Sequence, residues 1–210
     1  MPEVRLGGTD GRGAKAVAEF LDAQRFTREQ VFTEPSPVPN APGAYGWWFR
    51  AVPAAVDATG CEVRDGLTLL HVGISPTPPP ANGKKPVSQD LHKRIRYHFG
   101  GARGNADGSS LRKTLGVLLA AELGLELRRV GSGKQTTLAG GEAVLNQWMA
   151  ENALVSWVVR PEPWLFEDEL TADLVLPLNL QGDSAFHHEL KRLRREAVLK
   201  ANKLRVLKEW

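Results

Sequence analysis

Three short apolar runs along the chain have the length of single strands. Residues 44–52 and 67–74 each contain glycine where a strand normally carries a branched side chain, and residues 153–160 have the composition of a buried strand. The first two runs are about one loop apart, so we predict that they pair as antiparallel strands. A weaker run at residues 125–130 predicts a further short strand.

Between these runs, apolar residues recur at the spacing of a helix. We expect one helix that is capped by Ser88 and continues to about Phe99, and another that is capped by Ser109 or Ser110 and ends at Gly124. Further helices are predicted over residues 14–26, 142–152 and 163–175, and a long amphipathic basic helix near the C-terminus.

Proline marks the connections between these elements. Residues 33–43 contain four prolines and are predicted to be a linker that enters the main domain. Residues 75–89 contain several more, which excludes a helix or an inner strand there. The order of strands and helices predicts an α+β fold with a small antiparallel sheet. We therefore divide the chain into an N-terminal helix with a proline-rich linker (1–40), a main domain (41–182) and a C-terminal basic amphipathic helix (183–210).

Charge is concentrated at the C-terminal end. The 210-residue chain has a net charge of only +3, yet residues 188–210 carry eight Lys or Arg against three Glu. Such a segment is typical of phosphate binding or of a solvated helix face that covers an apolar stripe. The single cysteine excludes an internal disulfide, and the longest apolar run is too short to cross a membrane, so we expect a cytoplasmic protein.

Two familiar kinds of site are excluded by their motifs. The string GSGKQT at residues 131–136 lacks the Ser or Thr that follows lysine in a phosphate-binding loop, and Arg128 replaces its leading glycine. Five histidines with one cysteine, and no HExxH string, leave no adequate set of zinc ligands.

Two other segments carry candidate chemistry. In LHKRIRYHF, Lys93, Arg94 and Arg96 crowd one turn, and His98 lies four residues after Arg94, on the same helical face. This segment is a phosphate contact or a solvated basic face. In WLFEDELTADLVLPLN, three acidic residues occupy the first turns of a helix, where the helix dipole alone favours them; they are Glu167, Asp168 and Glu169.

These pieces, taken in order, resemble the GIY-YIG nuclease superfamily, and in particular its bacterial proteins with a GIY-YIG catalytic domain. The resemblance rests on GAY at 43–45, HVG at 71–73, Arg94 with His98, and Glu167 with Asn179. Five longer strings support it, namely PGAYGWW, LLHVGI, GSSLRKTLG, WMAEN and PLNLQG.

The resemblance implies a three-stranded antiparallel sheet and a catalytic domain over 41–182. It assigns the family's first tyrosine to Tyr45, which would receive a proton from the attacking water, and places His71 where the family has a second tyrosine. Imidazole can also donate to a phosphate or relay a proton. The family arginine maps to Arg94, which would stabilise charge on the phosphate, and His98 is a second candidate for proton transfer.

The resemblance also implies one divalent cation, Mg²⁺ or Mn²⁺. Its carboxylate ligand maps best to Glu167, with Asp168 and Glu169 as alternatives. The glycines of the two motifs would let the backbone approach the scissile phosphate. The substrate-binding residues that we expect are Gly43, Gly73, Lys93, Arg96, Asn179, Arg192, Arg194 and Arg195.

The function implied is metal-dependent endonucleolytic hydrolysis of phosphodiester bonds in nucleic acid, most simply DNA. One alternative is a catalytically impaired GIY-YIG-fold module that only binds nucleic acid, because His71 departs from the family pattern. The other is a protein-interaction domain that uses the apolar stripe of the C-terminal helix.

Overall fold

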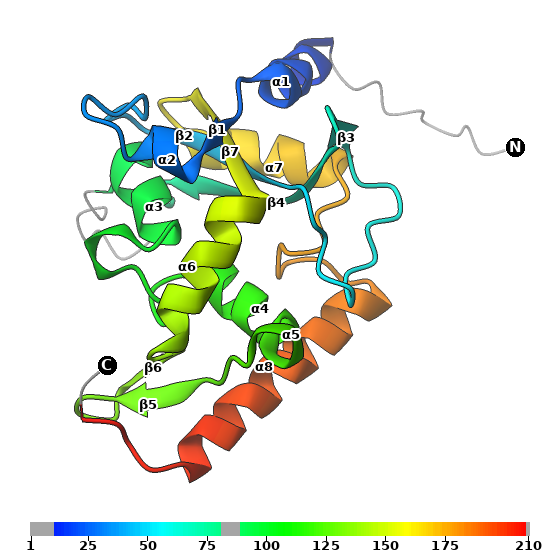
Figure 1. Ribbon diagram of the computed structural model, residues 1–210. Helices are drawn as coiled ribbons and strands as arrows, with labels where there is room; N and C mark the ends of the chain where they lie inside the picture. Colours follow the sequence, from blue (N-terminus) through cyan, green and yellow to red (C-terminus); the bar gives the residue numbers. More distant parts are fainter. Residues whose placement is uncertain (1–10, 81–88, 209–210) are drawn as a thin grey trace, which may run out of the picture.

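The chain folds around a five-stranded antiparallel sheet with helices on both faces (Figure 1). The computed structural model describes residues 11–80 and 89–208. The sheet has the strand order β1-β7-β2-β4-β3, and β5 and β6 form a separate hairpin. The strands are β1 Phe26–Thr27, β2 Gly43–Phe49, β3 Val63–Arg64, β4 Leu67–Ser75, β5 Arg128–Val130, β6 Gln135–Thr137 and β7 Ala153–Val159.

The predicted α+β class is confirmed, but the expected number of three strands is wrong. The three main apolar runs form the adjacent strands β7, β2 and β4. The two additional strands, β1 and β3, have two residues each and lie at the edges of the sheet. A two-residue strand has no alternating pattern to detect, so apolar spacing could not predict these edges.

Most helices lie close to their predicted positions, but the first ends at Asp22 rather than at residue 26, and the helix expected to run to Gly124 is divided at Leu119. A four-residue helix at Arg28–Val31 is not predicted by the sequence. The helices are α1 Gly11–Asp22, α2 Arg28–Val31, α3 Leu91–His98, α4 Ser110–Leu118, α5 Ala120–Leu123, α6 Gly141–Asn152, α7 Pro163–Asp173 and α8 Ala185–Lys203, with a 3-10 turn, η1, at Gly101–Arg103. Ser109 caps α4 as predicted, because its Oγ accepts a hydrogen bond from the Arg112 N–H at 3.1 Å. Gly124 ends α5 in the left-handed conformation, with φ of 66°.

One predicted cap is wrong. Helix α3 begins at Leu91, and its cap is Asp90, whose side chain accepts a hydrogen bond from the Lys93 N–H at 2.8 Å. Ser88 lies outside the described residues. Aspartate and serine are equally good caps, so the local sequence allowed both starting points.

Two hydrophobic cores lie on opposite faces of the sheet, and two neighbouring tryptophans divide between them. Trp47 is fully buried in the core that includes residues of α3, α4, α6 and α8, and Trp48 is fully buried in the core that includes residues of α1 and α7. Successive side chains of a strand point to opposite faces, so β2 supplies both cores. All of its residues are buried.

Strand β4 contains one extra residue relative to β2. Trp47 pairs with His71, whereas the next residue, Trp48, pairs with Leu69, so Leu70 is bulged out of the register. After the bulge the register is regular, and His71 and Gly73, which pair with Trp47 and Tyr45, lie on the same face of the sheet as these two residues. The carbonyl of Leu70 accepts a hydrogen bond from the Leu178 N–H at 3.0 Å, which brings the segment after α7 along this edge of β4.

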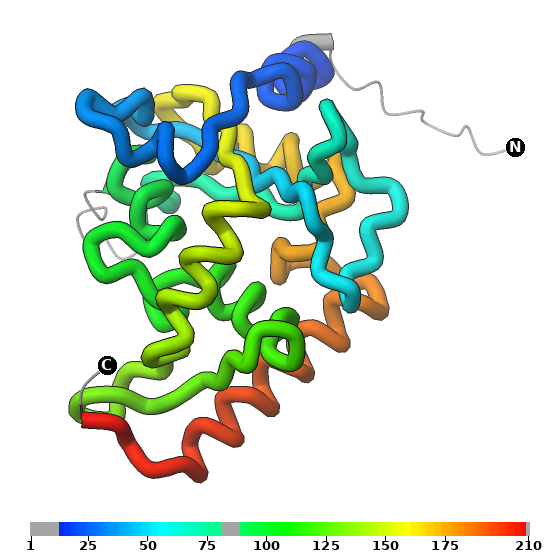
Figure 2. The backbone as a smooth tube through the Cα atoms, viewed as in Figure 1, coloured from blue at the N-terminus to red at the C-terminus, as the bar shows by residue number. Residues whose placement is uncertain are grey.

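The last helix is attached to the rest of the domain at its C-terminal end. Figure 2 shows the chain after α8 turning back beside the β5–β6 hairpin. There the Leu207 carbonyl accepts a hydrogen bond from the Gly131 N–H at 2.8 Å, and the Leu207 N–H donates to the Arg129 carbonyl at 2.9 Å. Along the helix, Leu190 and Ala201 are fully buried. In the described part of the chain, no helix has the length and apolar character needed to span a membrane.

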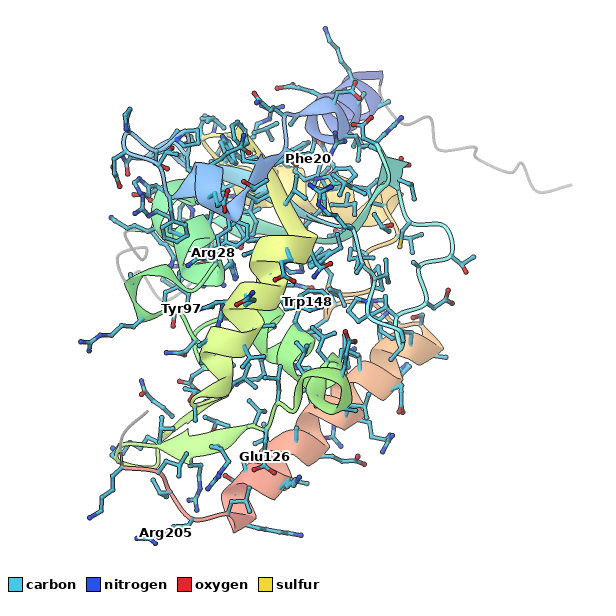
Figure 3. The ribbon with its side chains drawn as sticks, in the orientation of Figure 1. Phe20, Arg28, Tyr97, Glu126, Trp148 and Arg205 are labelled. Carbon is cyan, nitrogen blue, oxygen red and sulfur yellow. The ribbon has the colours of Figure 1, made fainter. Side chains whose placement is uncertain are left out.

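Helix α1 covers the face of the sheet opposite α3. Its Phe20 is fully buried and lies between α1 and the sheet (Figure 3). The Phe20 ring contacts Phe166 of α7 edge to face, with a centroid distance of 6.0 Å. At the helix surface Glu19 forms an ion pair with Arg160 at 2.8 Å. Helix α1 therefore holds α7 against the sheet.

We predict that Phe20→Ala lowers the free energy of unfolding by about 3–5 kcal/mol, because a large aromatic side chain is lost from a fully packed site. Thermal and urea unfolding measure this change. The control is Leu165→Ala on α7, since Leu165 is 57 % exposed and its removal should cost well under 1 kcal/mol. Equal effects of the two substitutions would contradict the packing role of Phe20.

Candidate active site

A pocket of about 370 Å³ opens beside the free edge of β4. It is lined by β2, β4, α3, α4, α7 and the segment after α7. The predicted site residues that it brings together are Tyr45, His71, Gly73, Arg94, His98, Glu167 and Asn179. The predicted substrate-binding residues that do not line it are Gly43, Lys93, Arg96, Arg192, Arg194 and Arg195.

Tyr45 and His98 form a buried hydrogen-bonded pair at the inner end of the pocket. The Tyr45 hydroxyl lies 3.0 Å from His98 Nε2, and the two side chains belong to residues that are 2 % and 1 % exposed. His98 Nδ1 in turn lies 2.7 Å from Ser109 Oγ. Trp47 packs edge to face against the imidazole, at a centroid distance of 5.7 Å. The Tyr45 hydroxyl is therefore held by a chain of hydrogen bonds that runs through His98 to Ser109, the cap of α4.

The titratable groups of the pocket are shifted toward their neutral forms. Burial raises the pKa of Tyr45, and the nearby Arg94 guanidinium opposes this shift. Burial, with the positive charge of Arg94 next in importance, lowers the pKa of His98 well below its usual range. Burial also lowers the pKa of His71 to about 4, although the Leu178 backbone carbonyl acts in the opposite direction. Both imidazoles are accordingly uncharged at neutral pH.

The His71 imidazole lines the pocket, and one of its two nitrogens has no hydrogen-bond partner among the described residues. The side chain is partly exposed to the pocket, and its Nδ1 atom is buried without a hydrogen-bond partner in the described residues. A buried polar atom without a partner is costly. The Leu178 backbone and the Asn179 side chain are the polar groups that act on this imidazole, because both raise its pKa against the effect of burial.

Arg94 is the only one of the three basic residues on α3 named above that reaches the pocket. Its Nη1 donates to the Gly108 carbonyl at 3.1 Å, which steadies the guanidinium across the opening. Lys93 forms an ion pair with the cap residue Asp90 at 3.4 Å. Arg96 pairs with Glu34 at 3.2 Å and lies over the Phe32 ring.

Among the three acidic residues at the start of α7, only Glu167 lines the pocket with Tyr45 and Arg94. It is partly buried, and burial together with the negative charge of Asp168 raises its pKa. Asp168 is exposed, and Glu169 lines a different pocket next to α1. The helix start thus presents one carboxylate to the site.

The Asn179 side chain is hydrogen-bonded to the edge of β4. Its Oδ1 accepts a hydrogen bond from the Val72 N–H and its Nδ2 donates to the Val72 carbonyl, both at 3.0 Å. The amide therefore completes the edge of the strand between His71 and Gly73. This is a positioning contact, of the kind that would otherwise need another strand.

The motif glycines make room for protein atoms. A Cβ on Gly73 would lie 2.6 Å from the Tyr45 hydroxyl oxygen, so the tyrosine can cross β4 only where a side chain is missing. A Cβ on Gly43 would lie 2.3 Å from the Val158 carbonyl oxygen and 2.7 Å from the Leu91 side chain. Gly73 thus shapes the pocket itself, and Gly43 lets β2 pack between β7 and α3.

The predicted arginines of α8 are placed unequally. Arg192 forms ion pairs with Glu189 and Glu196 on its own helix. Arg194 donates to the Ser110 carbonyl at 2.9 Å and to the Thr114 hydroxyl, so it joins α8 to α4. Arg195 is exposed and forms no ion pair within residues 11–80 and 89–208.

Sequence reasoning missed the residues that hold His98 in place by hydrogen bonds. Ser109 was identified only as a helix cap, and the buried pair of Arg112 with Glu142 was not anticipated. Arg112 Nη1 donates to the His98 carbonyl at 3.0 Å, while its Nε donates to Glu142 Oε2 at 3.1 Å. The one available signal was an arginine placed among the apolar residues of GSSLRKTLG.

The geometry can be compared with known families. Residues 43–196, more than half of the chain, match the family model of the GIY-YIG catalytic domain. The chain belongs to this family. No curated protein and no solved structure matches it. The family resemblance read from the motifs is confirmed, and it places this chain among nuclease domains.

The pocket of this GIY-YIG domain suits one hard divalent cation. Within the described residues no three His, Cys, Asp or Glu side chains gather as a metal cluster. A single carboxylate with water molecules is nevertheless a common way to hold Mg²⁺. Glu167 fits this role, because burial and Asp168 both disfavour its charge, and a cation would relieve that cost.

We predict that the GIY-YIG domain loses stability as the pH falls from about 6.5 toward 5. In the unfolded chain the histidines take up protons near pH 6.5, whereas in the folded chain His71 does so only near pH 4 and His98 also below its usual range. The unfolded state therefore binds more protons in this window, and the free energy of unfolding decreases on acidification.

The measurement is the melting temperature between pH 7 and pH 5. His71→Gln removes one of the two shifted groups and should make the pH dependence shallower. His92→Gln, outside the pocket, controls for loss of an imidazole. An identical slope for wild type and His71→Gln would contradict the prediction.

Proposed function

We propose that this protein is a metal-dependent endonuclease that hydrolyses phosphodiester bonds in DNA. The observation that carries the proposal is the convergence of Tyr45, His71, Arg94, His98 and Glu167 on one pocket from β2, β4, α3 and α7. Phosphodiester hydrolysis needs an activated nucleophile, positive charge on the non-bridging oxygens and help for the leaving oxygen. These five side chains supply groups of each kind.

Arg94 is the group that we assign to the phosphate. A guanidinium has five N–H donors, and the bond to the Gly108 carbonyl uses only Nη1. The remaining donors can bind two phosphate oxygens in a fork, which a lysine cannot do. Burial raises the pKa of Tyr45, and Arg94 offsets part of that rise, so the guanidinium stabilises the deprotonated phenol that would accept a proton from water.

Glu167 is the residue that would hold Mg²⁺ or Mn²⁺. When bound, such a cation polarises a phosphoryl oxygen and offsets the charge that develops on it. The contributions of the chain itself are to present one carboxylate, to keep the neighbouring imidazoles neutral and to aim the Tyr45 hydroxyl into the same space.

A nucleic-acid-binding module without catalysis is the second candidate function. It is favoured by His71, which stands where the family has a tyrosine and whose low pKa leaves it uncharged at neutral pH. A neutral imidazole still donates and accepts hydrogen bonds, and it faces the pocket beside Gly73. For this reason we favour the catalytic role.

Cleavage of single-stranded, duplex and branched DNA and of RNA, each with Mg²⁺, Mn²⁺ or a chelator, tests the proposed function. We expect cleavage of DNA that depends on the metal. Binding without cleavage of any substrate would favour the non-catalytic module, and no binding would favour a protein-interaction domain.

We predict that Glu167→Gln reduces cleavage by ~100-fold or more, because the charge that holds the cation is lost while the shape is kept. The melting temperature should stay the same or rise, since the carboxylate is held there against burial and the charge of Asp168. DNA binding should be retained. Arg94→Lys should also fail, because a point charge does not replace the fork.

Glu169→Gln is the matched control, since Glu169 is on the same helix and lines another pocket. It should cleave like wild type. Full activity of Glu167→Gln together with loss in Glu169→Gln would move the metal ligand to Glu169. Full activity of both variants would contradict a metal ligand at either position.

We predict that the basic helix α8 contributes phosphate contacts through Arg195 more than through Arg192. Arg195→Gln should reduce the slope of log affinity against log salt by about 1, which is the expected effect of losing one phosphate contact. Arg192→Gln should change it less, because Glu189 and Glu196 already neutralise Arg192. Unchanged slopes in both variants would favour α8 as a packing element.

A further inference from the structure

We propose that Ser109 is a positioning residue that holds His98 as a hydrogen-bond donor to Tyr45, so that the Tyr45 hydroxyl is left free to act in the pocket. The inference concerns the direction of the hydrogen bonds between these three side chains. Its cleavage readout rests on the proposed nuclease function, while its spectroscopic readout does not.

The two hydrogen-bond partners of Ser109 decide which atoms donate and which accept in the hydrogen bonds from Ser109 through His98 to Tyr45. Ser109 is fully buried. Among the described residues, its Oγ is bonded to the Arg112 N–H at 3.1 Å and to His98 Nδ1 at 2.7 Å. The Arg112 N–H can only donate, so Ser109 Oγ accepts from it. The hydroxyl proton of Ser109 is therefore left with His98 Nδ1 as its acceptor.

The alternative direction leaves a buried donor without a partner. If His98 Nδ1 carried the proton and donated to Ser109, the serine hydroxyl would have no acceptor within the described part of the chain. An unpaired buried donor is unfavourable by about 1–3 kcal/mol. The proposed direction avoids this cost, because the proton it leaves unpaired within the protein is that of Tyr45, which lines the pocket and can donate to water or a ligand there.

A neutral imidazole carries one proton, and burial is the main cause that keeps His98 neutral by lowering its pKa. The positive charges of Arg94 and Arg112 act in the same direction. With Nδ1 accepting from Ser109, the proton lies on Nε2. Nε2 is 3.0 Å from the Tyr45 hydroxyl oxygen, so His98 donates to it.

The direction of these hydrogen bonds determines what the Tyr45 hydroxyl can do. Its oxygen accepts from His98, and its own proton is free to point toward the pocket that it lines. When that proton leaves, the phenolate keeps the hydrogen bond from Nε2–H, which stabilises its charge. In the opposite direction Tyr45 would donate to His98 and would have to break that bond before it could donate in the pocket.

Further hydrogen bonds from Arg112 hold both Ser109 and His98 in this arrangement. Arg112, which donates its N–H to Ser109, also donates Nη1 to the His98 carbonyl at 3.0 Å. The same arginine is fully buried against Glu142. Both ends of the His98–Ser109 bond are thus tied to one residue.

The first measurement is the tautomer of His98 in the full chain at pH 8, from two-bond ¹H–¹⁵N NMR spectra without DNA or metal. We expect the Nε2–H form in the wild type. Ser109→Asp keeps a good helix cap, but a carboxylate can only accept, so His98 should change to the Nδ1–H form. A wild-type protein in the Nδ1–H form would overturn the proposal.

The second measurement is cleavage by the same variants. Ser109→Ala should lower the rate at least tenfold and Ser109→Asp by about 100-fold or more, which is the range of a misplaced general acid or base. The matched control is Ser184→Ala, because Ser184 caps α8 and also bonds a histidine, His187 Nδ1, at 2.7 Å, but is exposed and outside the pocket.

Ser184→Ala should keep wild-type cleavage. Equal losses in Ser109→Ala and Ser184→Ala would show that only a cap was removed, and would overturn the proposal. Full activity of Ser109→Asp with His98 in the Nδ1–H form would overturn it as well. If wild type does not cleave any substrate, the proposed function fails, and the tautomers of wild type and Ser109→Asp still decide the inference.

Discussion

The buried ion pair between Arg112 and Glu142 is the constraint on which the rest of the site depends. A fully buried guanidinium is tolerated only when its donors are satisfied. Here they reach the Glu142 carboxylate and the His98 carbonyl. The other oxygen of Glu142 accepts from the backbone N–H groups of Ala106 and Leu138, at 2.8 and 3.0 Å. One pair therefore joins α3, α4, α6, the loop before α4 and the end of the β5–β6 hairpin.

The position of the pocket follows from the two cores. Helix α3 packs on one face of the sheet and α7 on the other, so their polar side chains can meet only at an edge. That edge is β4, because β3 pairs only with the first residues of β4 and the rest of β4 has no neighbouring strand on that side. Asn179 satisfies the backbone of Val72 there. A guanidinium from one layer and a carboxylate from the other thus share one pocket without either being buried in a core.

The sequence was sufficient for the elements with a strong local signal. The three central strands and the main helices follow from apolar spacing, and the carboxylate and arginine that reach the pocket follow from the family motifs. What could not be predicted depends on contacts between distant segments. Without the family motif, charge and helical spacing would not distinguish Arg94, which reaches the pocket, from Arg96, which binds Glu34. In the same way, Ser109 has the pattern of a helix cap, and its bond to His98 exists only once α3 and α4 pack together.

The two-residue spacing of His71 and Gly73, directly after the extra residue at Leu70, limits how this domain can change during evolution. Within β4 the chemistry of a side chain can vary, as the histidine at position 71 illustrates, because a substitution leaves the alternation of the strand intact. Loss of Val72, in contrast, would make His71 and Gly73 successive residues of the strand, so the imidazole and Gly73 would face opposite layers. Related sequences should therefore differ at this motif by replacement and keep its length, so the spacing from the bulge to Gly73 is a more durable mark of descent than the identity of the residue at 71.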